Sequence, residues 1–469
     1  APGLPPIALV ALVVNVAALA HYIGAPEWPG GSHSVSLPCG RFFDRLIRPS
    51  PEPEQQGITV KTNAYIAGVG MTSFGKFLDQ GLKSIGTAAV EAAITDAGID
   101  RSKLQAAWVG NAAAGLVTGQ ESIRGQVVLR HAGIGKIPVV NVENACGSAS
   151  TAFNQAAIMV SAGAYDIVLA LGVEKLYHED KRKSFSAFTG AVDVEAMEEI
   201  MASLKKSAES GGAAQAASGA GEKRSMFMDI YAAGARRHME TYGTTAEQFA
   251  GVSAKNSFHG SMNERAQFRE ALSVEAVLAS PMIAEPLTRP MCSPIGDGAA
   301  AAILVSEKAA KELNLQDPIR VLCSAMVSGW DHEPEATGAA ATAATMAYDE
   351  AGLGPDDLSI VELHDASAPG EIFAYESLGL CSKGEGGKLI SDGTTKLGGR
   401  LPVNTSGGLL RKGHPVGATG IAQIVELTEQ LQGRAGKRQV EGARIGLAHN
   451  GGGSIGNDAA AMCITILGR

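Results

Sequence analysis

An internal repeat constrains the fold of this chain more than any other feature of its sequence. Residues 96–99 read Asp-Ala-Gly-Ile, residues 350–353 read Glu-Ala-Gly-Leu, and in both copies a leucine follows at the same spacing. Each copy has the pattern of a helix that ends at a glycine and leads into an apolar strand. A Val-Asn pair at 140–141 and again at 403–404 precedes a loop and a helix of small residues. Two correspondences in the same order predict a duplicated unit.

Strands and helices alternate along both copies. Ile167–Leu171 and Ala299–Val305 are continuous apolar runs, typical of buried strands, whereas Ser84–Ala97 has apolar residues near helical spacing. This alternation predicts βαβ units around a mostly parallel sheet. The stretch from Tyr177 to Ala284 is charged and helical in pattern, so we expect it to form a separate region.

Charge and cysteine usage exclude some functions. The formal net charge is -9, which argues against general nucleic-acid binding because phosphate recognition needs a clustered basic surface. The six cysteines are widely spaced and include no Cys-x-x-Cys pair, so we expect neither a disulfide framework nor a zinc site. No bound metal is predicted.

Residues 1–57 differ from the rest of the chain. They contain one apolar run, Ile7–Ala20, with no Lys or Arg before it. A membrane span takes roughly 20 residues, and a signal peptide has a basic start, so the run fits neither well. We interpret residues 1–57 as a non-core extension, and a targeting or membrane role is the alternative.

Cys146 is the first candidate catalytic residue. It lies in Asn-Ala-Cys-Gly-Ser-Ala-Ser at 144–150, between a predicted strand and a predicted helix. The thiolate is the reactive form of cysteine, and the N–H groups and positive dipole end at a helix start are expected to lower the thiol pKa. The alternative is that Cys146 is a small buried residue that fills a gap in the core.

His414 occupies the corresponding loop of the second copy, in Gly-His-Pro-Val-Gly-Ala-Thr-Gly at 413–420. A neutral imidazole can accept the proton of a cysteine nucleophile. Pseudo-symmetry between the halves would bring both helix starts to one cleft, with His414 beside Cys146. A satisfied structural histidine is the competing interpretation.

Two further histidines follow predicted strands. His364 precedes Asp365, and His449 precedes Asn450 and the glycine run 451–453. Glycine permits close backbone approach and can present N–H donors to a developing oxyanion. The run leads into strand-like residues and not into a helix, so it does not fit a dinucleotide- or phosphate-binding loop. For each histidine alone, a structural role stays open.

Together these motifs resemble the thiolase superfamily from about Tyr65 to Leu467. The resemblance is carried by the Gly-His-Pro-x-Gly-Ala-Thr-Gly string, the Val-Asn-x-x-Gly-Gly approach at 403–408 and the Gly-Asp-Gly-Ala-Ala stretch at 296–300. The His-Asp pair at 364–365 is similar to the sterol-carrier-protein-x or lipid-transfer type, where typical thiolases have Asn-Glu.

The resemblance implies a thiolase fold, an α/β protein with duplicated βαβαβαββ halves in a five-layer α/β/α/β/α arrangement. We expect an N-terminal half at 62–318 with a loop domain inserted at about 177–284, and a C-terminal half at 319–469. Each half would have a mixed five-stranded sheet. A homodimer or tetramer is also implied, as is a small OB-fold acyl-CoA-binding protein as a partner of some members.

The resemblance also implies a role for each candidate residue. Cys146 would take the acyl group as a thioester, His414 would activate it, and His364 would help bind the thioester oxygen. Typical thiolases carry a second cysteine, the acid or base for the α-carbon, at the position of His449. The lipid-transfer type carries it directly after His-Asp, where this chain has Ala366. His449 is therefore the candidate replacement.

The expected function is the cleavage of a 3-oxoacyl-CoA in lipid or sterol side-chain degradation. Coenzyme A would be a substrate, and no permanently bound cofactor is expected. Because the second cysteine is missing, two alternatives stay open: a retro-aldolase on β-hydroxyacyl-CoA, and a non-catalytic acyl-CoA or lipid-binding protein. The need for CoA favours a cytoplasmic location without stable membrane insertion.

Overall fold

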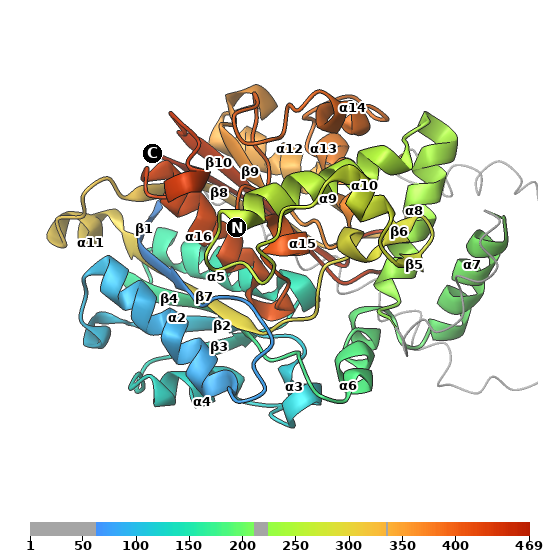
Figure 1. Cartoon of the computed structure of the whole chain (residues 1–469). Helices are drawn as coiled ribbons and strands as arrows, with labels where there is room; N and C mark the ends of the chain where they lie inside the picture. The colour runs from blue at the N-terminus through green and yellow to red at the C-terminus, as the bar shows by residue number, and fades with distance from the viewer. Residues whose placement is uncertain (1–61, 211–223, 334–335) are drawn as a thin grey trace, which may run out of the picture. The chain divides into compact units, whose positions relative to one another are not determined.

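The structure, a computed structural model, describes residues 62–210, 224–333 and 336–469. The predicted extension at 1–57 lies outside the described residues. Nine strands form one mixed sheet in the order β3-β2-β4-β7-β1-β8-β11-β10-β9 (Figure 1). The strands are β1 Ala64–Met71, β2 Ala106–Gly110, β3 Val139–Val142, β4 Ile167–Glu174, β7 Gly298–Ser306, β8 Ile319–Val327, β9 Ile360–Glu362, β10 Ile445–Gly452 and β11 Ala461–Gly468.

The sheet contains two copies of one strand arrangement. In the N-terminal copy, β4 is parallel to β2 and antiparallel to β7, and β7 is antiparallel to β1. In the C-terminal copy, β10 is parallel to β9 and antiparallel to β11, and β11 is antiparallel to β8. The copies meet where β1 pairs with β8. The duplicated α/β architecture predicted from the repeat is therefore confirmed.

The C-terminal copy differs from the expected five-stranded sheet at its edge. The counterpart of β3 is a single parallel bridge between Val361 and Val403. Pro402 has no N–H to donate, and Asn404 has a left-handed φ of 56°, so regular strand pairing does not extend to either side of Val403. The pairing of β1 with β8 also joins the copies into one sheet instead of two.

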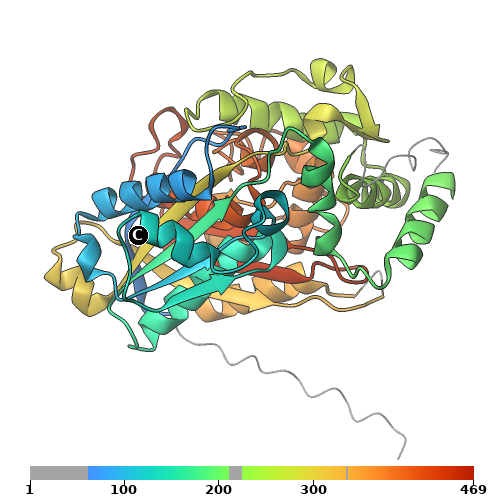
Figure 2. The ribbon, with the colours of Figure 1, turned by 90° about the horizontal axis from the view of Figure 1, so that it is seen from below.

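Helices form the remaining layers. Helices α5 (Ser148–Ser161) and α16 (Thr419–Leu431) pack against each other between the strands of the two copies (Figure 1). Helices α2 (Leu82–Ala97), which is blue in Figure 2, and α4 (Arg124–His131) cover the other face of the N-terminal strands. Helix α12 (Ala339–Ala351) covers the corresponding face of the C-terminal strands. The result is the expected five-layer order.

Strand β7 shows why the buried strands are apolar without interruption. Ala300, Ala302 and Leu304 pack toward the central helices, whereas Ala301 and Ile303 pack toward α2. Successive side chains of a strand point to opposite faces, and here both faces are covered by helices. Both sets of side chains are therefore buried, which matches the continuous apolar run in the sequence.

The predicted helical region lies between β4 and β7. It contains α6 Lys181–Ser186, α7 Met197–Ser210, α8 Phe227–Tyr242, α9 Ala246–Ser261, α10 Val274–Leu278 and the short pair β5 Met282–Ala284 and β6 Leu287–Thr288. Other helices are α3 Ala114–Thr118, α11 Glu307–Glu312, α13 Ala368–Ser377, α14 Gly386–Ser391 and α15 Gly408–Arg411. Helix α9 packs against α13 and α15. Among the helices of the described ranges, none has both the length and the apolar character to span a bilayer.

The first turns of α5 and α16 approach so closely that they require glycine. A Cβ on Gly420 would lie 1.9 Å from Ser150 Oγ and 2.7 Å from Ser150 N. Well-packed interiors do not tolerate such overlap. The turn of Cys146 leads into α5 and the loop of His414 leads into α16, so this approach sets the distance between the two predicted catalytic loops.

Gly420→Ala tests this close approach. The added Cβ overlaps Ser150, so the variant should lose about 1–3 kcal/mol of unfolding free energy, measured as a lower midpoint of denaturant unfolding. Gly135→Ala is the matched control, since no heavy atom lies within 4 Å of its Cβ position. Its stability should stay within about 0.5 kcal/mol of the wild type. Equal stability of both variants would contradict a glycine requirement at the helix contact.

Candidate active site

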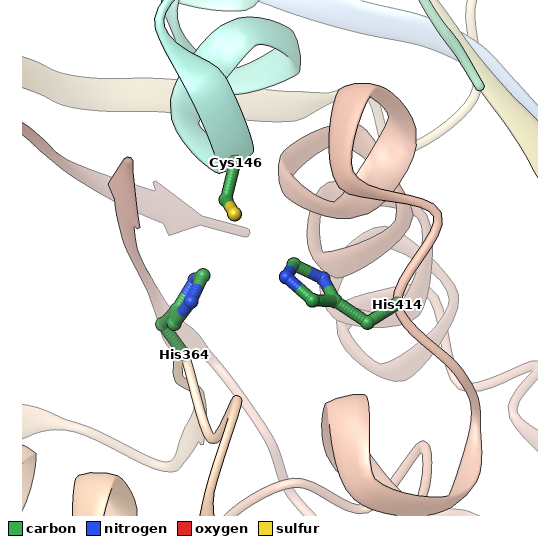
Figure 3. Close-up of side chains that lie close together, drawn as sticks. All are labelled: Cys146, His364 and His414. Carbon is green, nitrogen blue, oxygen red and sulfur yellow. The ribbon is translucent and has the colours of Figure 1, made fainter. Parts of the chain in front are cut away.

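Cys146 lies in the short 3-10 helix η3 (Ala145–Gly147), which follows β3 and runs directly into α5. Ala145 has a left-handed φ of 46°, and its N–H donates to Glu143 Oε1 at 2.6 Å. A non-glycine residue in this backbone region is uncommon and is often found at functional sites. The turn directs the Cys146 sulfur toward His364 and His414 (Figure 3).

The structure brings the predicted residues together. One donor atom each from Cys146, His364 and His414 lies within 4.8 Å of the others. The rings of His364 and His414 meet edge to face, with centroids 5.2 Å apart and an interplanar angle of 89°. His449 lines the same cavity as these three residues. All four candidates from the sequence therefore face one space.

Hydrogen bonds determine which nitrogen of His414 carries the proton. The Thr419 hydroxyl donates to the Pro415 carbonyl oxygen at 3.1 Å. Its Oγ1 also lies 2.7 Å from His414 Nδ1 and, having used its only proton, must accept there. Nδ1 therefore carries the proton, and the Nε2 lone pair of His414 is available as a base.

The same reasoning gives His364 the opposite tautomer. The Ser150 hydroxyl donates to Asn450 Oδ1 at 2.8 Å, which fixes the orientation of the amide. Asn450 Nδ2 then donates to His364 Nδ1 at 2.9 Å. Because Nδ1 accepts, the proton of the neutral ring is on Nε2. His364 can therefore donate a hydrogen bond from Nε2 to a developing negative oxygen.

His449 is held by the backbone of His364. Its Nδ1 accepts from the His364 N–H at 3.3 Å, so the proton of a neutral His449 ring is also on Nε2. The backbone carbonyl of His449 accepts from Gln423 Nε2 at 3.1 Å. His449 is thus a hydrogen-bond donor in the resting site and not a base.

Burial keeps the Cys146 thiol and the three imidazoles neutral. It raises the pKa of the Cys146 thiol to about 12, with a further contribution from the negative charge of Glu174. Burial lowers the pKa of His414 to about 3 and that of His449 to about 4, and it holds the pKa of His364 well below its usual range. The expectation of a lowered thiol pKa at the helix start was therefore wrong, because desolvation outweighs the backbone N–H groups.

Glu174 is a functional candidate that the sequence analysis missed. It ends β4, is fully buried, and accepts from the backbone N–H groups of Ala112, Ala113 and Gly417 at 3.0–3.2 Å. Burial raises its pKa, and these N–H groups oppose the shift. Gly417 belongs to the loop of His414, so Glu174 ties the two halves together beside the site. An acidic residue at the end of an apolar strand was the sequence signal.

Asp365 faces the protein interior and supports the loop that precedes His414. Its carboxylate accepts from the N–H groups of Leu409 at 2.7 Å and Leu410 at 3.4 Å, and from Asn256 Nδ2 at 2.8 Å. Burial and the neighbouring Glu371 raise the pKa of Asp365 well above its usual value. In the His-Asp pair, His364 thus lines the cavity, whereas Asp365 holds a neighbouring loop in position.

Cys146, His364 and His414 are also close enough to be considered as metal ligands. Zinc prefers thiolate and imidazole donors, and a ligating nitrogen must be free of its proton. His364 Nδ1 accepts from Asn450, so its Nε2 is protonated and unsuited to a metal. The hydrogen-bond pattern favours proton transfer over metal binding.

Comparisons with known proteins identify the family of this chain. The thiolase N-terminal domain family matches residues 64–308, and the thiolase C-terminal domain-like family matches residues 328–469. An acetyl-CoA acetyltransferase of Methanothermobacter thermautotrophicus is 41% identical and covers 84% of this chain and 97% of its own. Sterol carrier protein 2 of Bos taurus is 36% identical, covering 83% of this chain and 70% of its own.

A solved structure is similar as well. The Ltp2-ChsH2(DUF35) aldolase superposes with a TM-score of 0.70 and 27% identity, covering 87% of this chain and 98% of that chain. The family matches lie in both halves of the molecule and include the loops of Cys146, His364, His414 and His449. The chain belongs to the thiolase family of acyltransferases.

Proposed function

We propose that this chain is a 3-oxoacyl-CoA thiolase of the lipid-transfer type, which cleaves its substrate with coenzyme A through an acyl thioester on Cys146. One observation carries the proposal: a neutral thiol lies beside a base, His414 Nε2, and a hydrogen-bond donor, His364 Nε2. Thioester chemistry needs both groups, since the sulfur loses a proton while the attacked carbonyl oxygen gains negative charge.

In the proposed first step, His414 Nε2 takes the Cys146 proton as the sulfur attacks the C3 carbonyl. The C2–C3 bond then breaks, which leaves the shortened acyl group on Cys146 and an acyl-CoA enolate. His364 can donate to a negative oxygen, and the N–H groups of Cys146 and Gly453 face the sulfur. Removal of one such donor typically costs roughly 2.7–4 kcal/mol of transition-state stabilisation.

The cavity supports acyl-CoA as the substrate class. Its volume is about 840 Å³, within the usual range for small-molecule sites. Basic side chains that suit the CoA phosphates line it, namely Lys76, Lys181, Arg224, Arg289 and Lys383. Apolar side chains that suit an acyl chain are Phe185, Phe188, Phe227, Ile230, Phe268 and Phe373. Most of these residues come from the helical region between β4 and β7.

We extend the proposal to the domain boundaries, the assembly, the location and the partner of the protein. We place the halves at 62–318 and 319–469, with the loop domain at about 177–284 covering the CoA. The expected assembly is a cytoplasmic homodimer or tetramer without stable membrane insertion. A small OB-fold acyl-CoA-binding partner is supported by the similar Ltp2-ChsH2(DUF35) aldolase, whose name pairs two components.

A retro-aldolase on β-hydroxyacyl-CoA is the second candidate. Ala366 and His449 occupy the two places where related enzymes carry a second thiol, and the similar solved structure is described as an aldolase. Aldol cleavage needs no acyl-cysteine, however, so a nucleophile aligned with a base would have no use. The arrangement of Cys146 and His414 therefore favours the thiolase. It disfavours a purely lipid-binding protein for the same reason.

Intact-mass measurement after incubation with a 3-oxoacyl-CoA tests the acyl intermediate. The wild type should gain the mass of the shortened acyl group, and Cys146→Ser should not, because the serine hydroxyl is a much weaker nucleophile at neutral pH. Cys381→Ser is the control and should be acylated like the wild type. Turnover of a β-hydroxyacyl-CoA without an adduct would establish the aldolase instead. Binding without adduct or turnover would leave a lipid-binding protein.

Iodoacetamide alkylation, followed at the peptide that contains Cys146, reports the thiolate fraction of the free protein. Because burial raises the pKa of this thiol to about 12, its alkylation rate should rise about tenfold per pH unit from pH 7 to 10. The same cysteine in the denatured chain should level off above its ordinary pKa of about 8.5. A plateau below pH 8 in the folded protein would reveal a resting thiolate and contradict a neutral site.

A further inference from the structure

Cleavage of the C2–C3 bond produces an enolate whose α-carbon must receive a proton. The three histidines of the site are committed elsewhere. His414 holds the proton from Cys146, while His364 and His449 are neutral rings that accept at Nδ1 from Asn450 and from a backbone N–H. A neutral imidazole N–H is a weak acid, and the pKa of the His449 ring lies at about 4. The proton for the α-carbon therefore needs another source.

Tyr231 lies where this source is needed. It belongs to α8 and lines the same cavity as Cys146 and Ala366. Its ring packs against Gly370, where an added Cβ would lie 3.3 Å from Tyr231 Cε1 and 3.6 Å from the His364 carbonyl oxygen. The phenol thus borders the segment of His364 and Ala366. Gly370 has no side chain and Ala366 has a small one, so there is room beside the Tyr231 phenol.

The Tyr231 hydroxyl makes no hydrogen bond with any residue in the described part of the chain. A tyrosine hydroxyl that is largely enclosed usually finds a partner, so a group aimed into a cavity without one is suited to a ligand. Burial raises its pKa. The hydroxyl therefore keeps its proton at neutral pH and can deliver it.

We propose that Tyr231 is the acid and base that serves the α-carbon, in place of the second thiol; this rests on the proposed thiolase function. The Tyr231 O–H gives its proton to the enolate α-carbon, and the acyl-CoA formed from the enolate leaves while the shortened acyl group stays on Cys146. The resulting phenolate takes the proton of the incoming CoA thiol. The CoA thiolate attacks the acyl group on Cys146, and the departing Cys146 sulfur recovers its proton from His414. Every proton is returned at the end of the cycle.

Other cavity groups fit this role less well. The Cys292 thiol lines the cavity but is already committed to the Thr288 carbonyl oxygen, to which it donates at 3.6 Å. The Tyr177 ring lies under the Lys76 ammonium group, 5.2 Å from its centroid. In contrast, Tyr231 lines the cavity with Cys146 and packs against Gly370 beside His364.

Two acylation rates of Tyr231→Phe test the proposal, each followed by the mass of the acyl adduct on Cys146. Acylation by a 3-oxoacyl-CoA requires a proton for the α-carbon, so its rate should fall by about 100-fold or more. Acylation by a saturated acyl-CoA releases a CoA thiolate, a stable anion that needs no acid, so its rate should match the wild type. Tyr242→Phe removes a hydroxyl from the same helix outside the cavity and should leave both rates unchanged.

The outcomes distinguish failure of the proposed role of Tyr231 from failure of the proposed thiolase function. Equal rates of Tyr231→Phe and wild type with the 3-oxo substrate would overturn the role of Tyr231. An equal fall with both substrates would also overturn it, because the phenol would then only support the structure of the site. Absence of any adduct on the wild type would instead refute the thiolase function itself.

Discussion

The close packing of α5 against α16 is the contact on which the site depends. Gly420 of α16 meets Ser150 of α5, so a larger residue at 420 would force the central helices apart. A Cβ on Gly172 of β4 would lie 2.7 Å from Ala149 Cβ, so α5 is also packed tightly on the sheet. Each helix begins at a loop that carries one member of the candidate pair, Cys146 or His414. The separation of thiol and imidazole is thus set by main-chain packing in the core, where side chains have little freedom to adjust.

The second constraint is that the Cys146 thiol and the His414 imidazole stay neutral in the enclosed site. Glu174 brings a negative charge that is satisfied by backbone N–H groups of both halves. Burial shifts the pKa of Cys146 upward and that of His414 downward, and both shifts oppose a resting thiolate–imidazolium pair. Charge separation must therefore accompany the reaction, when the attacked carbonyl oxygen and its hydrogen-bond donors can share the developing charge. The tautomers fixed by Thr419 and Asn450 prepare the site for this moment.

Much of the fold could be predicted from the sequence because duplication leaves local signals. The repeated Ala-Gly helix ends and the Val-Asn pairs marked equivalent elements, and the apolar run of β7 marked a strand covered on both faces. The loss of the last strand at Val403 could not be predicted in the same way, since it depends on the backbone beside it. Pseudo-symmetry was enough to bring Cys146 and His414 together in the prediction.

The remaining features of the site depend on contacts between distant segments. Asn450 sets the tautomer of His364 only because Ser150, from the other half, orients its amide. Tyr231 reaches the cavity from α8, in a helical region with no motif to identify it. The direction of the Cys146 pKa shift was mispredicted because a helix start is visible in the sequence, whereas the degree of desolvation follows from the assembled core.

The protonation state of His414 is the most direct test of the central claim, that a neutral thiol lies beside a neutral base. Imidazole ¹⁵N chemical shifts, with the His414 signals identified by their loss in His414→Asn, report both ring nitrogens. Because the pKa of His414 is lowered to about 3, Nδ1 should be protonated and Nε2 bare throughout pH 5 to 9. Two protonated nitrogens near neutral pH would show an imidazolium paired with a thiolate and would contradict the claim.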